Sequence, residues 1–411
     1  MRIKDIVKLT TKSIIPNHET MYHLYSLPSF DENQNFEVLS GEEIQSNKFI
    51  VPDKCILFNK LNVRFKRVWR IDNKDVNKLC STEFLPLVVD ESKVDYQYCY
   101  YLLISDRITN YLCGQNTNTS GSHKRINPED FLNISITLPK MSIQKCIGRI
   151  LYDFDQKIAL NYAINDNLEN MAKQLYDYWF VQFDFPDENG RPYKSSGGEM
   201  VYNKRLKREI PIDWQVKNLI DFAEIKNGAT PSTADEANYG GDIVWITPKD
   251  LSDQQSKFVY QGERNITKQG FDSCSTSMLP ANSVLMSSRA PIGLVSIAKH
   301  DVCTNQGFKS FIPKNMEDSI FLYYYIKHNI KQIEQFGSGT TFKEVSRDDL
   351  CKFPILIVGA RDAYKQWIEL QNGIADKQLI LKKEIAALKV AIREQNSDVE
   401  IFELGYFYPA G

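Results

Sequence analysis

Residues 51–58 read Val-Pro-Asp-Lys-Cys-Ile-Leu-Phe, and a diverged copy of this stretch recurs as Leu-Pro-Ala-Asn-Ser-Val-Leu-Met at residues 279–286. The other matching blocks are, in chain order, residues 98–103 with 321–326 and residues 126–131 with 345–350. The offset between the copies becomes slightly smaller from each block to the next, as insertions and deletions in loops would produce. The sequence therefore predicts two copies of one structural unit.

Each copy is followed by a long stretch with helical periodicity. Residues 142–180 contain no proline and only one glycine, and residues 360–395 carry an apolar stripe of the same kind. At ~1.5 Å per residue each helix would be about 55 Å long. A narrow apolar seam needs a partner, so we expect the two helices to pair antiparallel; the alternative is that each packs on its own domain. Asn161 and Asn165 interrupt the first seam and would fix its register.

The remaining sequence alternates short β-branched and aromatic runs with turns, and each copy contains one aromatic helix, near residues 96–104 and 320–328. This pattern predicts an α/β (α+β) fold with two similar globular domains separated by two long antiparallel helices that form a coiled coil. The expected divisions are a first globular domain at 1–139, a helix at 140–180, a turn-rich linker at 181–213, a second globular domain at 214–358, a second helix at 359–396 and a tail at 397–411.

Composition limits the classes of function. Lys and Arg total 50 and Asp and Glu total 52 in 411 residues, a formal charge of -2, so DNA binding requires positive charge concentrated in patches. The chain has no apolar run of membrane-spanning length, no secretory signal at its start, and eight scattered cysteines without a Cys-x-x-Cys pair. These features predict a cytoplasmic protein with free thiols and no membrane contact.

A search for catalytic motifs finds none. The chain lacks a phosphate-binding Gly-x-x-x-x-Gly-Lys loop, a Gly-x-Ser-x-Gly elbow, an Asn-Pro-Pro-aromatic stretch and zinc-like spacing of its five histidines. We therefore expect no catalytic residue and no metal site. One alternative is a nuclease that uses Asp53, Glu91 and Lys93, but such short patterns occur by chance, and Asp53 already belongs to the repeat.

Basic and polar patches recur at corresponding places in the two copies. Residues 56–70 contain five basic residues and no acidic one, and the alternation at residues 64–68 predicts a strand with cations on one face. Arg can bridge guanine, Asn and Gln can bridge adenine, and Ser, Thr and Lys mostly hold phosphates. For any single patch a solvated surface is the simpler interpretation; the recurrence favours DNA. The candidate DNA-binding residues are Lys60, Arg64, Lys66, Arg67, His123, Lys124, Arg125, Ser287, Ser288, Arg289, Asn305, Gln306, Lys309, Thr340, Thr341 and Lys343.

Several blocks together resemble the specificity subunits of type I DNA restriction–modification systems, over essentially the whole chain. The blocks are Trp-Phe-Val-Gln-Phe-Asp-Phe-Pro (179–186), Tyr-Lys-Ser-Ser-Gly-Gly-Glu-Met (193–200), Glu-Ile-Pro-Ile-Asp-Trp (209–214), Gly-Ala-Thr-Pro-Ser (228–232), Trp-Ile-Thr-Pro-Lys-Asp-Leu (245–251), Ser-Ser-Arg-Ala-Pro-Ile-Gly (287–293), Thr-Asn-Gln-Gly-Phe (304–308) and Gly-Ser-Gly-Thr-Thr-Phe (337–342). The first copy departs from this pattern, since it has no counterpart of the Ser-Arg-Ala-Pro-Ile-Gly loop.

The resemblance implies a non-catalytic DNA reader. Each globule would grip one half of a bipartite site in double-stranded DNA, and the paired helices would fix the unread gap. The helices and one loop would dock two methyltransferase subunits, and a translocating nuclease subunit would add cleavage. S-adenosylmethionine, ATP and Mg²⁺ would be bound by those partners and no cofactor by this chain. The docking residues would be Tyr193, Lys194, Ser195, Ser196, Gly197, Gly198 and Glu199. The competing class is a stand-alone DNA-binding repressor or architectural protein with a coiled-coil spacer.

Overall fold

The computed structural model describes residues 1–115, 125–254, 256–337 and 343–403. The chain forms two compact units: unit 1 comprises Met1–Ile164 with Ile380–Gly411, and unit 2 comprises Asn165–Leu379. No helix in the described part of the chain is both long and apolar enough to cross a membrane.

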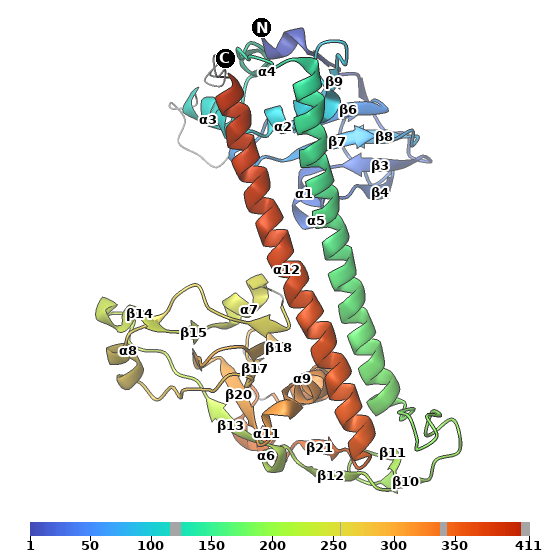
Figure 1. Cartoon of the computed structure of the whole chain (residues 1–411), viewed down its shortest axis with the longest axis vertical. Helices are drawn as coiled ribbons and strands as arrows, with labels where there is room; N and C mark the ends of the chain where they lie inside the picture. The colour runs from blue at the N-terminus through green and yellow to red at the C-terminus, as the bar shows by residue number, and fades with distance from the viewer. Residues whose placement is uncertain (116–124, 255, 338–342, 404–411) are drawn as a thin grey trace, which may run out of the picture. The chain divides into compact units, whose positions relative to one another are not determined.

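Unit 1 contains two β-sheets and several short helices (Figure 1). Its strands are β1 (Val7–Leu9), β2 (Ser13–Ile14), β3 (Met21–Tyr25), β4 (Glu37–Ser40), β5 (Lys48–Ile50), β6 (Lys54–Asn59), β7 (Val68–Asp72), β8 (Lys78–Cys80) and β9 (Phe84–Val89). Its short helices are α1 (Leu27–Asn33), α2 (Tyr96–Leu103), α3 (Asp106–Gln115) and α4 (Pro128–Leu132). The strand orders are β1-β9-β6-β7 and β2-β5-β8-β3-β4.

Unit 2 is built around one larger sheet of order β13-β20-β17-β18-β16. Its strands are β10 (Met200–Asn203), β11 (Arg208–Pro211), β12 (Gln215–Asn218), β13 (Ala223–Asn227), β14 (Tyr239–Ile243), β15 (Trp245–Ile246), β16 (Phe258–Val259), β17 (Val284–Ser288), β18 (Ile292–Ala298), β19 (Cys303–Thr304), β20 (Phe308–Pro313) and β21 (Pro354–Ile357). Its short helices are α6 (Leu219–Phe222), α7 (Pro248–Gln254), α8 (Lys268–Asp272), α9 (Ser319–His328), α10 (Ile330–Gln335) and α11 (Arg347–Lys352).

The two main sheets repeat one topology. The first repeated block forms β6 in unit 1 and β17 in unit 2, and each strand lies between an antiparallel β9 or β20 and an antiparallel β7 or β18. Both strands are almost continuously buried, which is consistent with the apolar runs Cys55–Phe58 and Val284–Met286 within them. The strand order β1-β9-β6-β7 therefore corresponds to β13-β20-β17-β18, and the predicted class of two similar α/β domains with long helices is confirmed.

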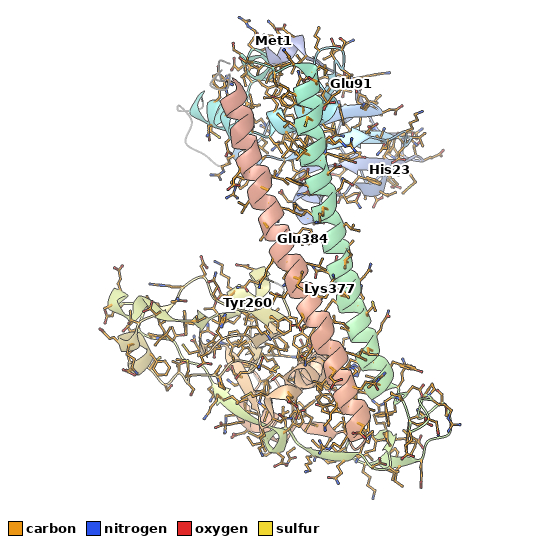
Figure 2. All side chains as sticks on the ribbon, viewed as in Figure 1. Met1, His23, Glu91, Tyr260, Lys377 and Glu384 are labelled. Atoms are coloured by element: carbon orange, nitrogen blue, oxygen red, sulfur yellow. The ribbon has the colours of Figure 1, made fainter. Side chains whose placement is uncertain are left out.

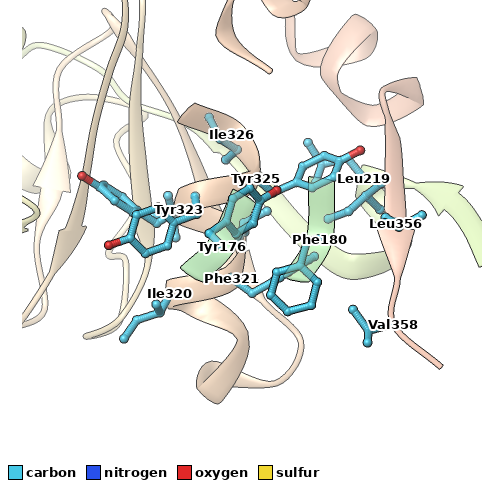
Figure 3. Packing of buried hydrophobic residues seen from close by; sticks show 14 of the residues in the cluster. Tyr176, Phe180, Leu219, Ile320, Phe321, Tyr323, Tyr325, Ile326, Leu356 and Val358 are labelled. Carbon is cyan, nitrogen blue, oxygen red and sulfur yellow. The ribbon is translucent and has the colours of Figure 1, made fainter. Parts of the chain in front are cut away.

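The aromatic blocks form α2 and α9, which are buried along most of their length. In unit 2, α9 packs against the end of the first long helix and against the second, α12 (Arg361–Glu403). Figure 3 shows Phe180 beside Phe321, whose ring centroids are 5.1 Å apart in an edge-to-face arrangement. Such aromatic pairs add stability beyond the area that they bury. The aromatic content of the blocks thus supplies the core under the sheet.

Two long helices run through both units as continuous elements. Helix α5 spans Met141–Tyr176 and continues as a π-helical turn, η3 (Asp177–Val181), and α12 spans Arg361–Glu403. In unit 2, Gln378 contacts the backbone of Asn165 and Gln371 contacts that of Ala172, so the two helices are antiparallel there.

In unit 1 the helices are joined through Glu384, which is labelled in Figure 2. The Asn161 amide donates to its carboxylate at 3.0 Å, and Lys157 forms an ion pair with it. Asn161 is buried, and its partner lies on the other helix. A buried polar contact between two helices favours one register over others, as expected for this seam residue.

Candidate nucleic-acid interface

The first basic patch lies in the connection between β6 and β7. The alternating residues 64–68 do not form the predicted strand; a 3-10 turn, η2 (Val63–Phe65), occupies the segment and β7 begins only at Val68. The reason is the backbone: Asn62 and Lys66, on either side of the turn, both adopt left-handed conformations, which an extended strand does not contain. The cations are therefore presented by a compact turn.

An exposed aromatic ring organises this turn. Phe65 is 52% exposed, and the guanidinium groups of Arg64 and Arg67 each lie 4.7 Å from its ring centroid. Cation–π contacts of this kind are attractive, contributing about 0.5–1 kcal/mol each at exposed sites, and they favour these positions of the two guanidinium groups. The sequence analysis predicted both arginines as DNA-binding residues but did not include Phe65. Its position between two arginines in the sequence could have indicated this role.

Two cations of the turn already have acidic partners within unit 1. Arg67 binds Asp31 through two hydrogen bonds of 2.6 and 2.7 Å, and Lys66 pairs with Asp106. The Lys66–Asp106 pair is exposed on both sides, and exposed ion pairs contribute little stability, so a phosphate oxygen could replace Asp106 at low cost. Arg67 differs, because only 15% of its side chain is exposed and Asp31 holds it through two hydrogen bonds.

Arg125 lies beside the same turn, because the amide of Ile126 donates a 2.9 Å hydrogen bond to the carbonyl of Lys60. Its guanidinium binds both carboxylate oxygens of Glu83, and this hydrogen bond raises the pKa of Arg125. The fold thus brings Lys60 and Arg125 together from well-separated parts of the sequence.

The second patch lies in the connection between β17 and β18, the equivalent place in unit 2. Ser287 and Ser288 are fully buried. The Ser287 hydroxyl donates to the carbonyl of Pro291 at 2.7 Å, and the Ser288 hydroxyl and amide both donate to that of Gly307. These two residues are therefore withdrawn from the candidate contact set: their hydroxyls face inward and hold the turn that presents Arg289.

Arg289 and Lys309 share one acidic partner. Glu344 lies 3.0 Å from the Lys309 ammonium and 4.0 Å from the Arg289 guanidinium. Lys309 is buried, with 9% of its side chain exposed, whereas 38% of the Arg289 side chain is exposed. Arg289 is therefore the better placed of the two for DNA, and Lys309 holds Glu344. Lys343, the residue before Glu344, is exposed.

A polar loop after β19 lies beside this turn. The Asn305 carboxamide oxygen accepts the Gly307 amide at 2.9 Å, and the exposed Gln306 carboxamide accepts the hydroxyl of Thr230. Gly228 allows the approach, since a Cβ there would lie 2.0 Å from the Asn305 carbonyl oxygen. Gln306 is therefore exposed and oriented by Thr230, whereas Asn305 shapes the loop. Thr230 was not among the predicted residues, although its block was part of the family resemblance.

The equivalent position carries opposite charge in the two units. Arg125 and Glu344 correspond, because each immediately precedes its copy of the third repeated block, at residues 126–131 and 345–350. Arg125 binds Glu83, while Glu344 binds Lys309. The same backbone scaffold therefore presents different electrostatics at equivalent positions of the two units. His123, Lys124, Thr340 and Thr341 lie outside the described residues.

The predicted docking loop is exposed but firmly braced in unit 2. Asp184, which is buried, accepts the Ser195 amide at 2.7 Å and its hydroxyl at 2.6 Å. The Tyr193 ring stacks on Phe185 at 4.7 Å, and its hydroxyl donates to the Glu199 carbonyl. The loop residues Lys194, Ser195, Ser196, Gly197 and Glu199 are exposed, and Gly198 is half-buried against Tyr193.

The three residues of the nuclease alternative take part in separate ion pairs. Asp53 pairs with Lys78, Glu91 with Lys54 at 2.7 Å, and Lys93 with Asp90 at 3.0 Å. Among the described residues, no group of three or more His, Cys, Asp or Glu side chains is arranged to hold a metal ion.

The sequence matches a known family model over most of its length. The model of the type I restriction modification DNA specificity domain matches residues 1–170 and 211–390. The MjaIX specificity subunit of Methanocaldococcus jannaschii is 43% identical over 144 residues, which are 34% of this chain and 33% of that protein. The HindI specificity subunit of Haemophilus influenzae is 28% identical over 334 residues, which are 70% of this chain and 72% of that protein. The chain thus spans about a third of the first relative and over two thirds of the second.

Solved structures show a related fold. The S subunit of a type I restriction–modification system from M. genitalium has a TM-score of 0.60 at 14% identity, covering 97% of this chain and 95% of that one. A chain from a structure of a type I system, described in terms of complex assembly and conformational transition, has a TM-score of 0.50 at 17% identity. At such low identity these likenesses concern the fold alone.

Proposed function

Because the chain belongs to the family of type I restriction modification DNA specificity proteins, we propose that it is the subunit that selects the DNA sequence in a type I restriction–modification complex. Each globule reads one half of a bipartite site in double-stranded DNA. The observation that carries the proposal is the repeated placement of a basic connection beside the central strand, after β6 in unit 1 and after β17 in unit 2.

The reading chemistry differs between the units. In unit 1 the contacts come from a cationic turn around Phe65, with Lys60, Arg64 and Arg125 close by. In unit 2 they come from Arg289 and Gln306, which offer the bidentate groups that suit guanine and adenine. The carboxylate that neutralises the exposed Arg125 holds its guanidinium in place for a phosphate, and phosphate contacts set orientation rather than sequence.

The long helices fix the number of base pairs between the half-sites. Support comes from the buried polar contacts that hold their register, Asn161 with Glu384 in unit 1 and Gln371 with Ala172 in unit 2. A helix rises ~1.5 Å per residue. Two helices in a fixed register therefore set a length in steps smaller than one base pair.

Catalysis belongs to partner subunits. The braced loop 193–199 and exposed apolar side chains on both long helices, such as Ile150, Leu160 and Ile380, are surfaces suited to two methyltransferase subunits. Those subunits bind S-adenosylmethionine and methylate adenine, which has to leave the base stack to be reached. A restriction subunit adds translocation and cleavage with ATP and Mg²⁺. We place the complex in the cytoplasm and away from membranes.

The test is co-purification followed by methylation mapping. The tagged chain, expressed together with a type I methyltransferase subunit from the same genome, should retain that protein. Methylation-sensitive sequencing of the host genome should then reveal one motif with two halves and a constant gap. A chain that binds a DNA site alone and retains no methyltransferase would instead be a repressor or architectural protein. Metal-dependent cleavage by the isolated chain would favour the nuclease alternative.

A further inference from the structure

In unit 1, the carboxylate of Asp155 on α5 joins the helix to the globule. It accepts a 2.5 Å hydrogen bond from the Tyr101 hydroxyl on α2 and lies 3.0 Å from the guanidinium of Arg70 on β7. The Arg70 guanidinium also lies 4.3 Å from the ring centroid of Tyr100 and 5.0 Å from that of Tyr152. Arg70 belongs to the basic run of residues 56–70, but with 18% of its side chain exposed it faces the helix.

Unit 2 contains the same three chemical groups on another part of α5. The Glu169 carboxylate lies 2.9 Å from the ammonium of Lys257, and the Tyr324 hydroxyl on α9 donates to it at 3.5 Å. The Lys257 ammonium is 5.1 Å from the Tyr324 ring centroid, and only 5% of the lysine side chain is exposed. Each globule therefore meets α5 through a cation, a carboxylate and a tyrosine.

The tyrosines are equivalent residues of the repeat. Tyr101 and Tyr324 each occupy the fourth position of the second repeated block, at residues 98–103 and 321–326. Burial raises the pKa of both hydroxyls well above that of free tyrosine. Each hydroxyl therefore stays protonated and donates a hydrogen bond to the carboxylate. Hydrogen bonds to a charged acceptor are among the stronger contacts in proteins.

The cations, in contrast, come from different places: Arg70 lies on β7, and Lys257 immediately precedes β16. In unit 1, Arg70 pairs with Ile56 across the sheet, and the corresponding pair in unit 2 is Ile297 with Val284. Lys257 lies one strand further out, where its carbonyl accepts the amide of Ile297 at 2.8 Å. The cation was therefore relocated between the copies while the contact with α5 was kept. Both units thus place a cation against a carboxylate of α5, but they use residues at different positions to do so. This indicates that both units require the ion pair with α5 and did not simply inherit it.

We infer that the triads Arg70–Asp155–Tyr101 and Lys257–Glu169–Tyr324 are clamps that fix the rotation of each globule on its own segment of α5, and that Asp155 and Glu169 are positioning residues for gap length. The inference rests on the proposed function, since it assigns these residues to the spacing between half-sites and not to reading bases. Two polar contacts from two elements of the globule to one carboxylate oppose rotation about the helix axis. A seam of apolar side chains resists that rotation poorly because the hydrophobic effect is non-directional.

The experiment uses the complete methyltransferase complex and duplexes that carry the mapped half-sites. The clamp variants are Asp155→Asn and Glu169→Gln, which keep side-chain size, and the matched control is Asp166→Asn, an exposed carboxylate on the same helix. Dissociation constants are measured for the natural gap, for gaps longer and shorter by one base pair, and for the natural gap with one half-site base changed. If an amide variant does not assemble, Tyr101→Phe and Tyr324→Phe, which each remove one hydroxyl, replace it.

We expect the preference of each clamp variant for the natural gap to fall about tenfold, with base discrimination unchanged, while the control behaves as the parent. Unchanged gap preference in both variants would overturn the inference, and so would an equal loss of gap and base discrimination, which indicates a general loss of stability. If the parent protein shows no gap preference, the proposed function fails and the inference fails with it. The two failures can be told apart, because failure of the proposed function shows in the parent protein, whereas failure of the inference alone shows only in the variants.

Discussion

The side-chain amide of Gln371 donates a 3.0 Å hydrogen bond to the backbone carbonyl of Ala172, and both residues are fully buried. Gln371 lies on α12 and Ala172 on α5, within a layer that also contains the buried Trp367. Burial of a carboxamide is costly unless it is hydrogen-bonded, so this contact favours the one helix register in which the amide finds an acceptor.

Replacing Gln371 by Ala should lower the free energy of unfolding by about 1–3 kcal/mol, because the hydrogen bond is lost and a cavity forms. Gln371→Leu fills the space and should cost less. Chemical denaturation of the full chain measures both. The exposed Gln366 on the same helix provides the control, since its alanine variant should change stability by less than about 0.5 kcal/mol. Equal losses for Gln366→Ala and Gln371→Ala would contradict this account.

Arg289→Ala should weaken DNA binding. If the guanidinium contacts a base, the cost is roughly 1–3 kcal/mol with relaxed specificity at one position; if it contacts a phosphate, the salt slope falls by about one. Titrations at several salt concentrations distinguish the two results. Arg149→Ala, at a side chain that is 84% exposed on α5, is the control. Unaltered affinity and slope for Arg289→Ala would remove this residue from the interface.

Asp184→Ala should weaken methyltransferase retention about tenfold, because it removes both hydrogen bonds that brace Ser195 in the docking loop. Gly198→Ala should act similarly, since a Cβ would lie 2.5 Å from the Tyr193 ring. Quantitative pull-down checks both, with Glu188→Ala, an exposed carboxylate nearby, as the control. Full retention by both loop variants would show that docking occurs elsewhere.

A matched insertion of one heptad in both long helices, after Ile164 in α5 and after Leu379 in α12, should lengthen the recognised gap. One heptad adds ~10 Å of helix, which corresponds to about three base pairs. Methylation mapping gives the new gap directly. The insertion in α5 alone should abolish methylation, because it breaks the register with α12. If the protein with both insertions still recognised the original gap, the length of the helices would not determine the gap length.

Acidification should destabilise unit 2 through His328. Desolvation lowers its pKa below the ordinary value of 6.5, although Asp177 lies 3.7 Å away and opposes the shift. The unfolded chain therefore takes up this proton at a higher pH than the folded chain does, so the contribution to stability is complete above the unfolded pKa and is lost as the pH falls below it. Melting temperatures from pH 8 to 5 should fall less for His328→Gln than for the parent. The exposed His300 supplies the control, and parallel curves for His328→Gln and parent would refute the assignment.

The repeat and the helices could be predicted because their signals are local. The buried centres of β6 and β17 appear as short apolar runs, Cys55–Phe58 and Val284–Met286. The seam of α5 appears as apolar residues at three- and four-residue steps. The turn around Phe65 was missed because two left-handed residues interrupt an alternation that otherwise resembles a strand. Backbone conformation at single polar residues is weakly encoded in a sequence pattern.

Sequence alone was enough to establish two copies of one α/β unit with two long helices, and a charge that must act in patches, since periodicity and repetition report local burial. Only the tertiary structure showed which charged side chains remain exposed. Arg289 is 38% exposed and lies 4.0 Å from Glu344, Lys309 is 9% exposed and is held by Glu344 at 3.0 Å, and Arg70 is turned onto Asp155. These three cations occur in similar basic segments, but the acidic partners of Arg70 and Lys309 are far from them in the chain. Ion pairing depends on distance in space, which no local pattern records.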